Sequence, residues 1–232
     1  MNKKLILIPD IHGREFWKDA AEFIGSDIPV VFLGDYLDPY PHEHIGNKKA
    51  IDNFKEILDT TKNKDNVTLL LGNHDCTYIW PEDGICECRT DYTNFPMIQR
   101  IFQDNLERFK LCTEKEGFII SHAGIHQNWL DFVGIKKENI LERQIDRIDH
   151  KIIESLGVVS WYRGGIDNYG SPVWADIREF QYYQGQNQIC GHTQQYEKPL
   201  RIGDVVCLDC RACFYVDNED DIRWLKDDKV VE

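Results

Sequence analysis

Short apolar runs recur along the chain, and polar residues with glycine follow most of them. The runs are Leu5–Ile8, Val30–Leu33, Val67–Leu71, Phe118–Ile120 and Ile189–Cys190. Each run is too short for a helix, and most are rich in Val, Ile and Leu, as strands buried on both faces are. The pattern therefore predicts five buried β-strands.

The segments between the first three runs have helical spacing. Residues 15–24 and 45–61 both place apolar side chains three or four positions apart, which gives each segment one apolar face. Strands that alternate with helices in this way are typical of a largely parallel α/β core.

The pattern changes from Val205 onward. Three short strand-like stretches follow one another at 205–208, 212–216 and 222–225, and the acidic segment Asp217–Asp221 supplies a turn before the last. These stretches predict a second, more antiparallel sheet packed on the first. Because the chain shows no repeat, low-complexity segment or linker, we expect residues 1–232 to form a single domain.

Two segments show little periodicity, namely Cys76–Pro96 and Gly157–Gly185. Long irregular loops in a compact domain often form the rim of a functional site. Their aromatic residues could equally cover the core, so both interpretations stay open at this point.

The composition is that of a globular protein with a strongly acidic balance. Hydrophobic residues make up 42% of the chain, and 40 Asp and Glu residues against 27 Lys and Arg residues give a formal charge of −13. This charge argues against a nucleic-acid footprint or an anionic membrane surface as partner, since both need a concentrated basic face. A small anionic substrate remains compatible, because bound metal ions can reverse the local field.

The N-terminal apolar run ends at Pro9, which is too early for a secretory signal, and no stretch is long enough to span a bilayer. We therefore expect a cytoplasmic protein with reduced cysteines. Cys207, Cys210 and Cys213 have a spacing that can bind zinc or an iron–sulfur cluster, and Cys86 and Cys88 form a further pair. The apolar setting of the first three favours packing residues instead.

Potential metal ligands follow every predicted strand up to Cys190. They are Asp10 and His12; Asp35 and Asp38; Asn73, His74 and Asp75; His122; and His192. In open α/β sheets, ligands bind beyond the carboxyl ends of the strands, so we expect these side chains to converge. Carboxylate, carboxamide and imidazole groups suit a pair of divalent cations such as Mn, Fe, Zn or Mg.

The ordered motifs DIHG, GDYLD, GNHD, SHAG and GHT, between residues 10 and 193, resemble those of the calcineurin-like metallophosphoesterases. The lead-ins VVFLGDYLD and LLLGNHD are most similar to the phosphoprotein phosphatase branch and its bacterial relatives. The resemblance implies an α/β fold, a four-layer α/β/β/α sandwich of two mixed sheets. It also implies a dinuclear metal site at the carboxyl ends of the strands.

The resemblance also implies roles for individual residues. The metal ligands would be Asp10 and His12 for the first ion, Asp35 as the bridge, and Asn73, His122 and His192 for the second. A hydroxide held between the metals would attack phosphorus in line, and His74, oriented by Asp38, would protonate the leaving oxygen. Manganese is the metal we expect first, with iron, zinc or magnesium as alternatives.

The sequence departs from the family pattern at two places. Thr193 and Gln194 follow His192 where many members have a second histidine, and Pro39 follows Asp38 where the phosphoprotein phosphatase branch has a phosphate-binding arginine. Replacement phosphate ligands could come from Arg14, Arg163 and Arg178, since arginine binds phosphate through two parallel hydrogen bonds. Surface salt bridges are the alternative role for these arginines.

These features favour a hydrolase of phosphomonoesters, with a phosphorylated small molecule, a nucleotide or a phosphoprotein as substrate. A phosphodiesterase or dinucleoside polyphosphate hydrolase could use the same metal pair. A third hypothesis is a binding or scaffold protein that keeps the fold but has no enzymatic activity. Loss of a metal ligand or of the proton donor would favour that reading, and the sequence retains all of them.

Overall fold

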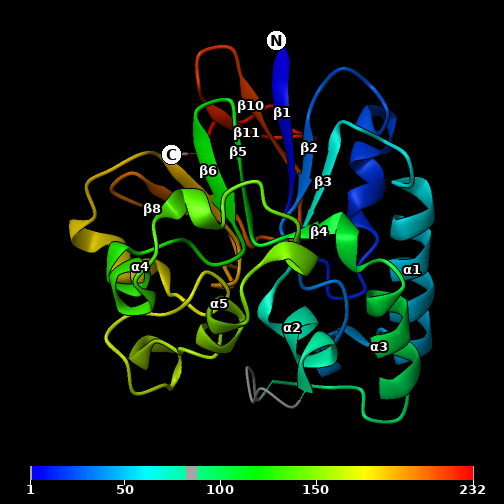
Figure 1. The fold of residues 1–232 in the computed structure, drawn as a ribbon. Helices are drawn as coiled ribbons and strands as arrows, with labels where there is room; N and C mark the ends of the chain where they lie inside the picture. Colours follow the sequence, from blue (N-terminus) through cyan, green and yellow to red (C-terminus); the bar gives the residue numbers. More distant parts are fainter. Residues whose placement is uncertain (1, 82–87, 232) are drawn as a thin grey trace.

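The first of two mixed β-sheets begins with the N-terminal strand and is built mainly from parallel strands (Figure 1). The computed structural model describes residues 2–81 and 88–231. The strand order is β11-β10-β1-β2-β3-β4, in which β1 to β4 are parallel and β10 and β11 are antiparallel additions. The bounds are β1 (Lys3–Ile8), β2 (Val30–Phe32), β3 (Val67–Leu70), β4 (Phe109–Lys110), β10 (Phe214–Asp217) and β11 (Ile222–Trp224).

The second sheet has the order β5-β6-β7-β9-β8. Its three central strands are parallel to one another, and the two edge strands are antiparallel to their neighbours. The bounds are β5 (Cys112–Lys115), β6 (Phe118–Ser121), β7 (Gln188–Cys190), β8 (Leu200–Ile202) and β9 (Val205–Cys207).

The two sheets pack face to face and share a core. Leu5 and Leu7 of β1 contribute to one apolar cluster with Ile120 of the second sheet, whereas Ile6 and Ile8 belong to the cluster on the outer face. Successive side chains of a strand point to opposite faces, so β1 is buried on both sides. This double burial explains why the run is continuously apolar.

Helices cover the outer faces of the sheets. On the first sheet they are η1 (Phe16–Phe23), α1 (Asn47–Thr60) and α3 (Phe95–Gln103), which supply Trp17, Phe54 and Phe102 to the outer core. The second sheet is covered by η8 (Ile177–Tyr182), whose Phe180 packs in one cluster with residues of β7 and β9. The remaining helices are α2 (Asn73–Ile79), α4 (Gln127–Val133), α5 (His150–Ser155), η2 (Pro41–Glu43), η4 (Leu106–Arg108), η5 (Lys137–Asn139), η6 (Ile145–Arg147) and η7 (Trp161–Arg163).

The predicted α/β class with two mixed sheets is confirmed, and segment 15–24 is helical as expected, in the 3-10 form. Two other expectations about elements were wrong. The C-terminal strands do not make a sheet of their own, because β9 joins the second sheet while β10 and β11 extend the first. Parts of the segment 76–96 are helical, since α2 and α3 enter it from either side.

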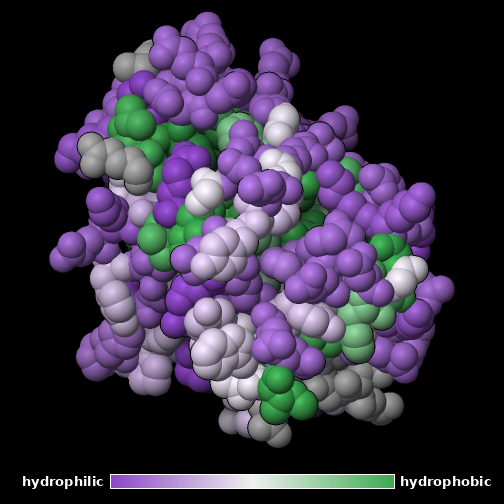
Figure 2. Space-filling view, turned by 90° about the vertical axis from the view of Figure 1, so that its left-hand side faces the viewer, coloured by the Kyte–Doolittle hydropathy of each residue, from purple (hydrophilic) through white to green (hydrophobic). Residues whose placement is uncertain are grey.

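The surface of the molecule is largely hydrophilic on the side that faces the viewer in Figure 2. On the face shown in Figure 2, hydrophilic residues predominate and the hydrophobic residues are scattered among them. In the parts that the structure describes, no helix combines the length and the apolar character that crossing a membrane requires.

Candidate metal centre

The carboxyl ends of strands from both sheets bring the predicted ligands into one buried group, here called the strand-end cluster. Its members are Asp10 after β1 with His12, Asp35 after β2, Asn73 after β3, His122 after β6 and His192 after β7. All six are buried, with at most 5% of any residue exposed. Parallel strands end at the same edge of a sheet, and the stacked sheets place their two edges together.

The backbone at these strand ends is held in an uncommon conformation. Asp10, His12, Asp35 and His192 have φ values of 26°, 44°, 54° and 67°. Non-glycine residues rarely adopt positive φ, and such strain gathers at functional sites where the surroundings enforce it. This conformation turns the backbone sharply after each strand, so that these four side chains lie at the edge of the sheets.

Asp35 lies between two histidines. Its Oδ2 is 3.4 Å from Nε2 of His12 and 3.5 Å from Nε2 of His122, while its Oδ1 accepts a hydrogen bond of 3.0 Å from the backbone N–H of His74. Burial alone would raise the pKa of Asp35, but the neighbouring imidazoles outweigh it and lower the pKa to about 2. An ionised oxygen that faces ring nitrogens on both sides is suited to bridge two cations.

His12 presents a free ring nitrogen to this site. Its Nδ1 donates a 2.9 Å hydrogen bond to the carbonyl of Leu37, which fixes the tautomer and leaves the Nε2 lone pair toward Asp35. Burial lowers the pKa of His12 to about 3, so the ring is neutral. Asp10 accepts a 2.8 Å bond from the backbone N–H of His192 at Oδ1, and its buried Oδ2 has no partner among the described residues.

His122 shows the same arrangement on the other side. Its Nδ1 donates to the carbonyl of Leu33 at 2.8 Å, and its Nε2 lies 3.1 Å from both Asn73 Oδ1 and His192 Nδ1. Burial lowers the pKa of His122 and of His192. Carbonyl groups that orient the non-coordinating nitrogen are a common support of metal-binding histidines.

These donor atoms fit divalent cations. The candidate ligand atoms of Asp35, His122 and His192 lie within 4.8 Å of one another, as do those of His12, Asp35 and His74. Two buried polar atoms, Asp10 Oδ2 and His192 Nε2, lack hydrogen-bond partners within the described part of the chain. Neutral imidazoles, carboxylates and an amide oxygen are the set that such cations bind.

Glycines make room for the two carboxylates. A Cβ on Gly72 would lie 2.1 Å from Asp35 Oδ1, and a Cβ on Gly191 would lie 1.9 Å from Asp10 Oδ2. Both distances are far below van der Waals contact, so any larger residue must displace the carboxylate or the strand end.

We therefore expect Gly191→Ala to weaken Mn²⁺ binding by roughly 10- to 100-fold, the usual effect of disturbing the supports of a metal site. Titration calorimetry on the folded variant measures this directly. Gly46→Ala is the matched control, because a Cβ there would meet no atom of the described residues within 4 Å. Wild-type Mn²⁺ affinity in folded Gly191→Ala would show that Asp10 does not bind the metal.

His74 lies beside the cluster with one ring nitrogen held in place. Its Nδ1 is 2.9 Å from Asp38 Oδ2 and 3.1 Å from the carbonyl of Arg89, and Asp38 Oδ1 accepts a 2.5 Å bond from the Tyr78 hydroxyl. Burial disfavours the charged ring, but Asp35 and Asp38 outweigh this effect and raise the pKa of His74 well above its ordinary value. These carboxylates therefore favour the charged form of the His74 ring, and the neighbouring Cys88 adds to the same shift of the pKa.

The structure places the three predicted arginines differently. Arg14 donates through Nη1 to the carbonyl of Asp10 at 3.0 Å and through Nε to Glu43, and its buried Nη2 has no partner among the described residues. Arg163 is near enough to the cluster for its charge to add to burial in lowering the pKa of His192. Arg178 is held by both carboxylate oxygens of Asp176, at 2.7 and 2.9 Å.

Two neighbouring residues escaped the sequence analysis. Asp209 follows β9 and is buried; burial and the charge of Asp35 raise its pKa to about 7 even though Arg14 opposes the shift. Asp209 also follows an apolar run, as the predicted ligands do. The surrounding cysteines led this segment to be interpreted as a packing strand instead. Arg89 belongs to an irregular segment, and no sequence pattern marks it.

The thiols of Cys207 and Cys213 bond to backbone carbonyls, whereas Cys88 lies beside His74 and contributes to raising the pKa of His74. The thiol of Cys207 donates to the carbonyls of Gly191 and Thr193, on either side of His192, and the thiol of Cys213 donates to the carbonyl of Phe16. Burial raises the pKa of both thiols, which keeps them protonated. Cys86 lies outside the described residues.

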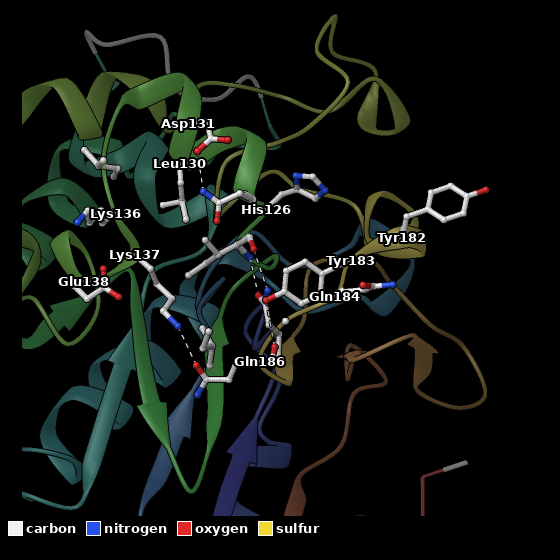
Figure 3. A pocket seen from close by; sticks show the side chains of 16 residues that line it. His126, Leu130, Asp131, Lys136, Lys137, Glu138, Tyr182, Tyr183, Gln184 and Gln186 are labelled. Atoms are coloured by element: carbon white, nitrogen blue, oxygen red, sulfur yellow. Dashed lines mark hydrogen bonds between the residues drawn. The ribbon is translucent and has the colours of Figure 1, made fainter.

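A separate cavity of about 620 Å³ lies between α4 and the segment that leads into β7 (Figure 3). Its polar lining is largely paired within itself, since Lys137 binds Gln186 at 2.9 Å and Gln127 binds Asp131 at 2.8 Å. None of its lining residues belongs to the strand-end cluster. The candidate chemistry is therefore located at the sheet edge and not in this cavity.

Comparisons with known proteins agree with this geometry. A family model described as calcineurin-like phosphoesterase matches residues 3–196. The fold is similar to that of a cold-active protein-tyrosine phosphatase of the psychrophile Shewanella sp., with a TM-score of 0.63, 13% identity, and coverage of 100% of this chain and 81% of that one. A mutant of a cold-active protein tyrosine phosphatase gives a TM-score of 0.61 at 15% identity, with the same coverage. No curated protein sequence matches the chain.

Proposed function

The chain belongs to the calcineurin-like phosphoesterase family, whose members hydrolyse phosphate esters, and on that premise we propose that it hydrolyses phosphomonoesters at the strand-end cluster. One observation carries the proposal. An ionised Asp35 oxygen faces Nε2 of His12 on one side and Nε2 of His122 on the other. The imidazolium of His74 stands directly beside it.

The residues that would hold two divalent cations are Asp10 and His12 for one ion, Asp35 between them, and Asn73, His122 and His192 for the other. Manganese is the first choice, and iron, zinc and magnesium are compatible with the same donors. When bound, such a pair lowers the pKa of a coordinated water and stabilises charge on the phosphoryl group. Without cations, the carboxylates here would repel an anionic substrate.

His74 supplies the proton that the departing oxygen needs. An alkoxide is a poor leaving group unless it is protonated as the bond to phosphorus breaks. His74 holds a proton at Nε2, and its Nδ1–H stays bound to Asp38 throughout. Asp38 is itself fixed by Tyr78, so the ring keeps one orientation while the proton leaves.

The substrate phosphate would meet positive charge at the rim of the cluster. Among the arginines considered from the sequence, Arg14 is best placed, because it is anchored on Asp10 and its buried Nη2 has no partner in the described part of the chain. Arg163 is a second candidate: it lies 3.9 Å from Asp176, whereas two short hydrogen bonds hold Arg178 on the same carboxylate. A phosphorylated small molecule, a nucleotide or a phosphoprotein could present such a group.

A substrate panel with Mn²⁺-loaded protein tests the proposal. It contains an aryl phosphomonoester, an aryl phosphodiester, a dinucleoside polyphosphate, and phosphotyrosine and phosphoserine peptides. We expect the highest kcat/KM with a monoester. Turnover of only the diester or the polyphosphate would replace the proposal with the corresponding activity, and no turnover by protein with both ions bound would indicate a binding protein.

A further inference from the structure

Arg89 is linked to both halves of the general-acid pair. Its Nη2 donates to the backbone carbonyl of Asp38 at 3.0 Å, and its own carbonyl lies 3.1 Å from Nδ1 of His74. Its guanidinium carbon is 3.9 Å from the centre of the Tyr40 ring, which in turn is 5.0 Å from the ring of His12. The arginine is therefore connected through the Tyr40 ring to His12 of the strand-end cluster.

Arg89 still has hydrogen-bonding capacity at this position. Its Nε is buried and has no partner in the described parts of the chain, and the same is true of Nη2 of Arg14. Buried donors without partners are destabilising and therefore rare, unless a water or a ligand satisfies them. Each guanidinium group thus has one nitrogen that the described residues leave unpaired.

Both arginines lie against Tyr40. The guanidinium carbon of Arg14 is 5.5 Å from the centre of its ring, compared with 3.9 Å for Arg89. Stacking on an aromatic face holds a guanidinium in one plane without using its N–H groups. Tyr40 therefore helps to orient both guanidinium groups, and each keeps one buried nitrogen, Nη2 of Arg14 and Nε of Arg89, without a partner among the described residues.

We propose that Arg89, together with Arg14, binds the phosphoryl oxygens of the substrate and selects monoesters over diesters. This inference rests on the proposed function of the same site. Pro39 follows Asp38 directly, so this loop has no arginine next to Asp38. Arg89 comes from a different loop, and its hydrogen bond to the Asp38 carbonyl places a guanidinium group next to Asp38.

The chemistry of the two ester classes explains the selection. A phosphomonoester has three non-bridging oxygens and up to two negative charges, whereas a diester has two such oxygens and one charge. A guanidinium group binds phosphate through paired, charge-assisted hydrogen bonds, so an additional arginine gains more from the monoester. The role is one of substrate binding, and the proton at His74 is not involved.

Arg89→Ala and Arg89→Lys test the inference, with Arg100→Ala as control because the Arg100 side chain is 81% exposed. The first readout is binding of inorganic phosphate to the Mn²⁺-loaded proteins by calorimetry. Loss of a charge-assisted hydrogen bond should weaken phosphate binding by roughly 10- to 100-fold in Arg89→Ala. We expect a smaller loss in Arg89→Lys, which keeps the charge but not the fork, and none in Arg100→Ala.

The second readout is kinetic. Arg89→Ala should raise KM for an aryl monoester more than kcat falls, and should change kcat/KM for the matching diester much less. Unchanged phosphate affinity together with a lower kcat would overturn the proposal and make Arg89 a positioning residue for His74. Equal losses for both esters would remove the selectivity. Wild-type protein that binds phosphate through Arg89 yet cleaves no ester would contradict the proposed function alone.

Discussion

Asp35→Asn is expected to remove nearly all activity, because the Asp35 side chain lies between His12 and His122, which belong to the two proposed metal positions. Its Oδ2 lies 3.4 Å from His12 Nε2 and 3.5 Å from His122 Nε2, so loss of its charge weakens both metal positions together. An amide keeps the shape but not the charge that offsets two cations. We expect kcat to fall by roughly 10²–10³-fold or more, the scale of losing one preorganised electrostatic group. Elemental analysis of the same samples should show fewer than two ions per chain.

Asp52→Asn is the control for this change, because Asp52 is exposed on the outer surface of α1. It should keep wild-type activity and metal content. If Asp35→Asn retained both ions and full activity, Asp35 would not be a bridging ligand, and the assignment of the two metal positions would be wrong.

His74→Asn should slow hydrolysis of alkyl phosphomonoesters by roughly 10²–10⁴-fold, the usual contribution of general acid catalysis. The defect should shrink for aryl esters with acidic alcohols, because those leave without protonation. The carboxylates around His74 raise its pKa, so the imidazolium is present at neutral pH and is lost as pH rises through that raised value. The wild-type rate with alkyl esters should therefore fall as pH rises through this pKa. The variant should not show this decrease.

Metal content separates catalysis from structure in this experiment. His74→Asn should bind as much Mn²⁺ as the wild type, and His150→Asn, at an exposed position on α5, should behave as the wild type throughout. An equal defect for alkyl and aryl esters, or loss of the ions, would show that His74 acts as a ligand or a structural residue. His74 does lie near enough to His12 and Asp35 for that alternative to be tested.

The strand ends were predictable because two local signals coincide there. A continuous apolar run predicts a strand that is buried on both faces. A polar residue directly after the run predicts a side chain at the edge of the sheet. These two signals together predict that Asp10, Asp35, Asn73, His122 and His192 converge, as the structure shows. The same two signals are present at Asp209, so the sequence also contained the information needed to predict this residue.

Sheet membership was not predictable in the same way. The periodicity of a strand reports which side chains are buried, but it does not report which neighbour the strand pairs with. β9 and β10 are separated by only a few residues, yet they join different sheets. Arg89 is a further example, because only the fold brings its loop to Asp38 and Tyr40.

The most direct test of the central claim is a metal titration of activity. Protein stripped with a chelator is supplied with increasing Mn²⁺, and hydrolysis of an aryl phosphomonoester is measured beside the number of ions bound. We predict no activity without metal, and activity that rises with occupancy until two ions are bound per chain. Full activity in excess chelator, or no hydrolysis with both ions bound, would contradict the assignment of this cluster as a metal-dependent phosphomonoesterase site.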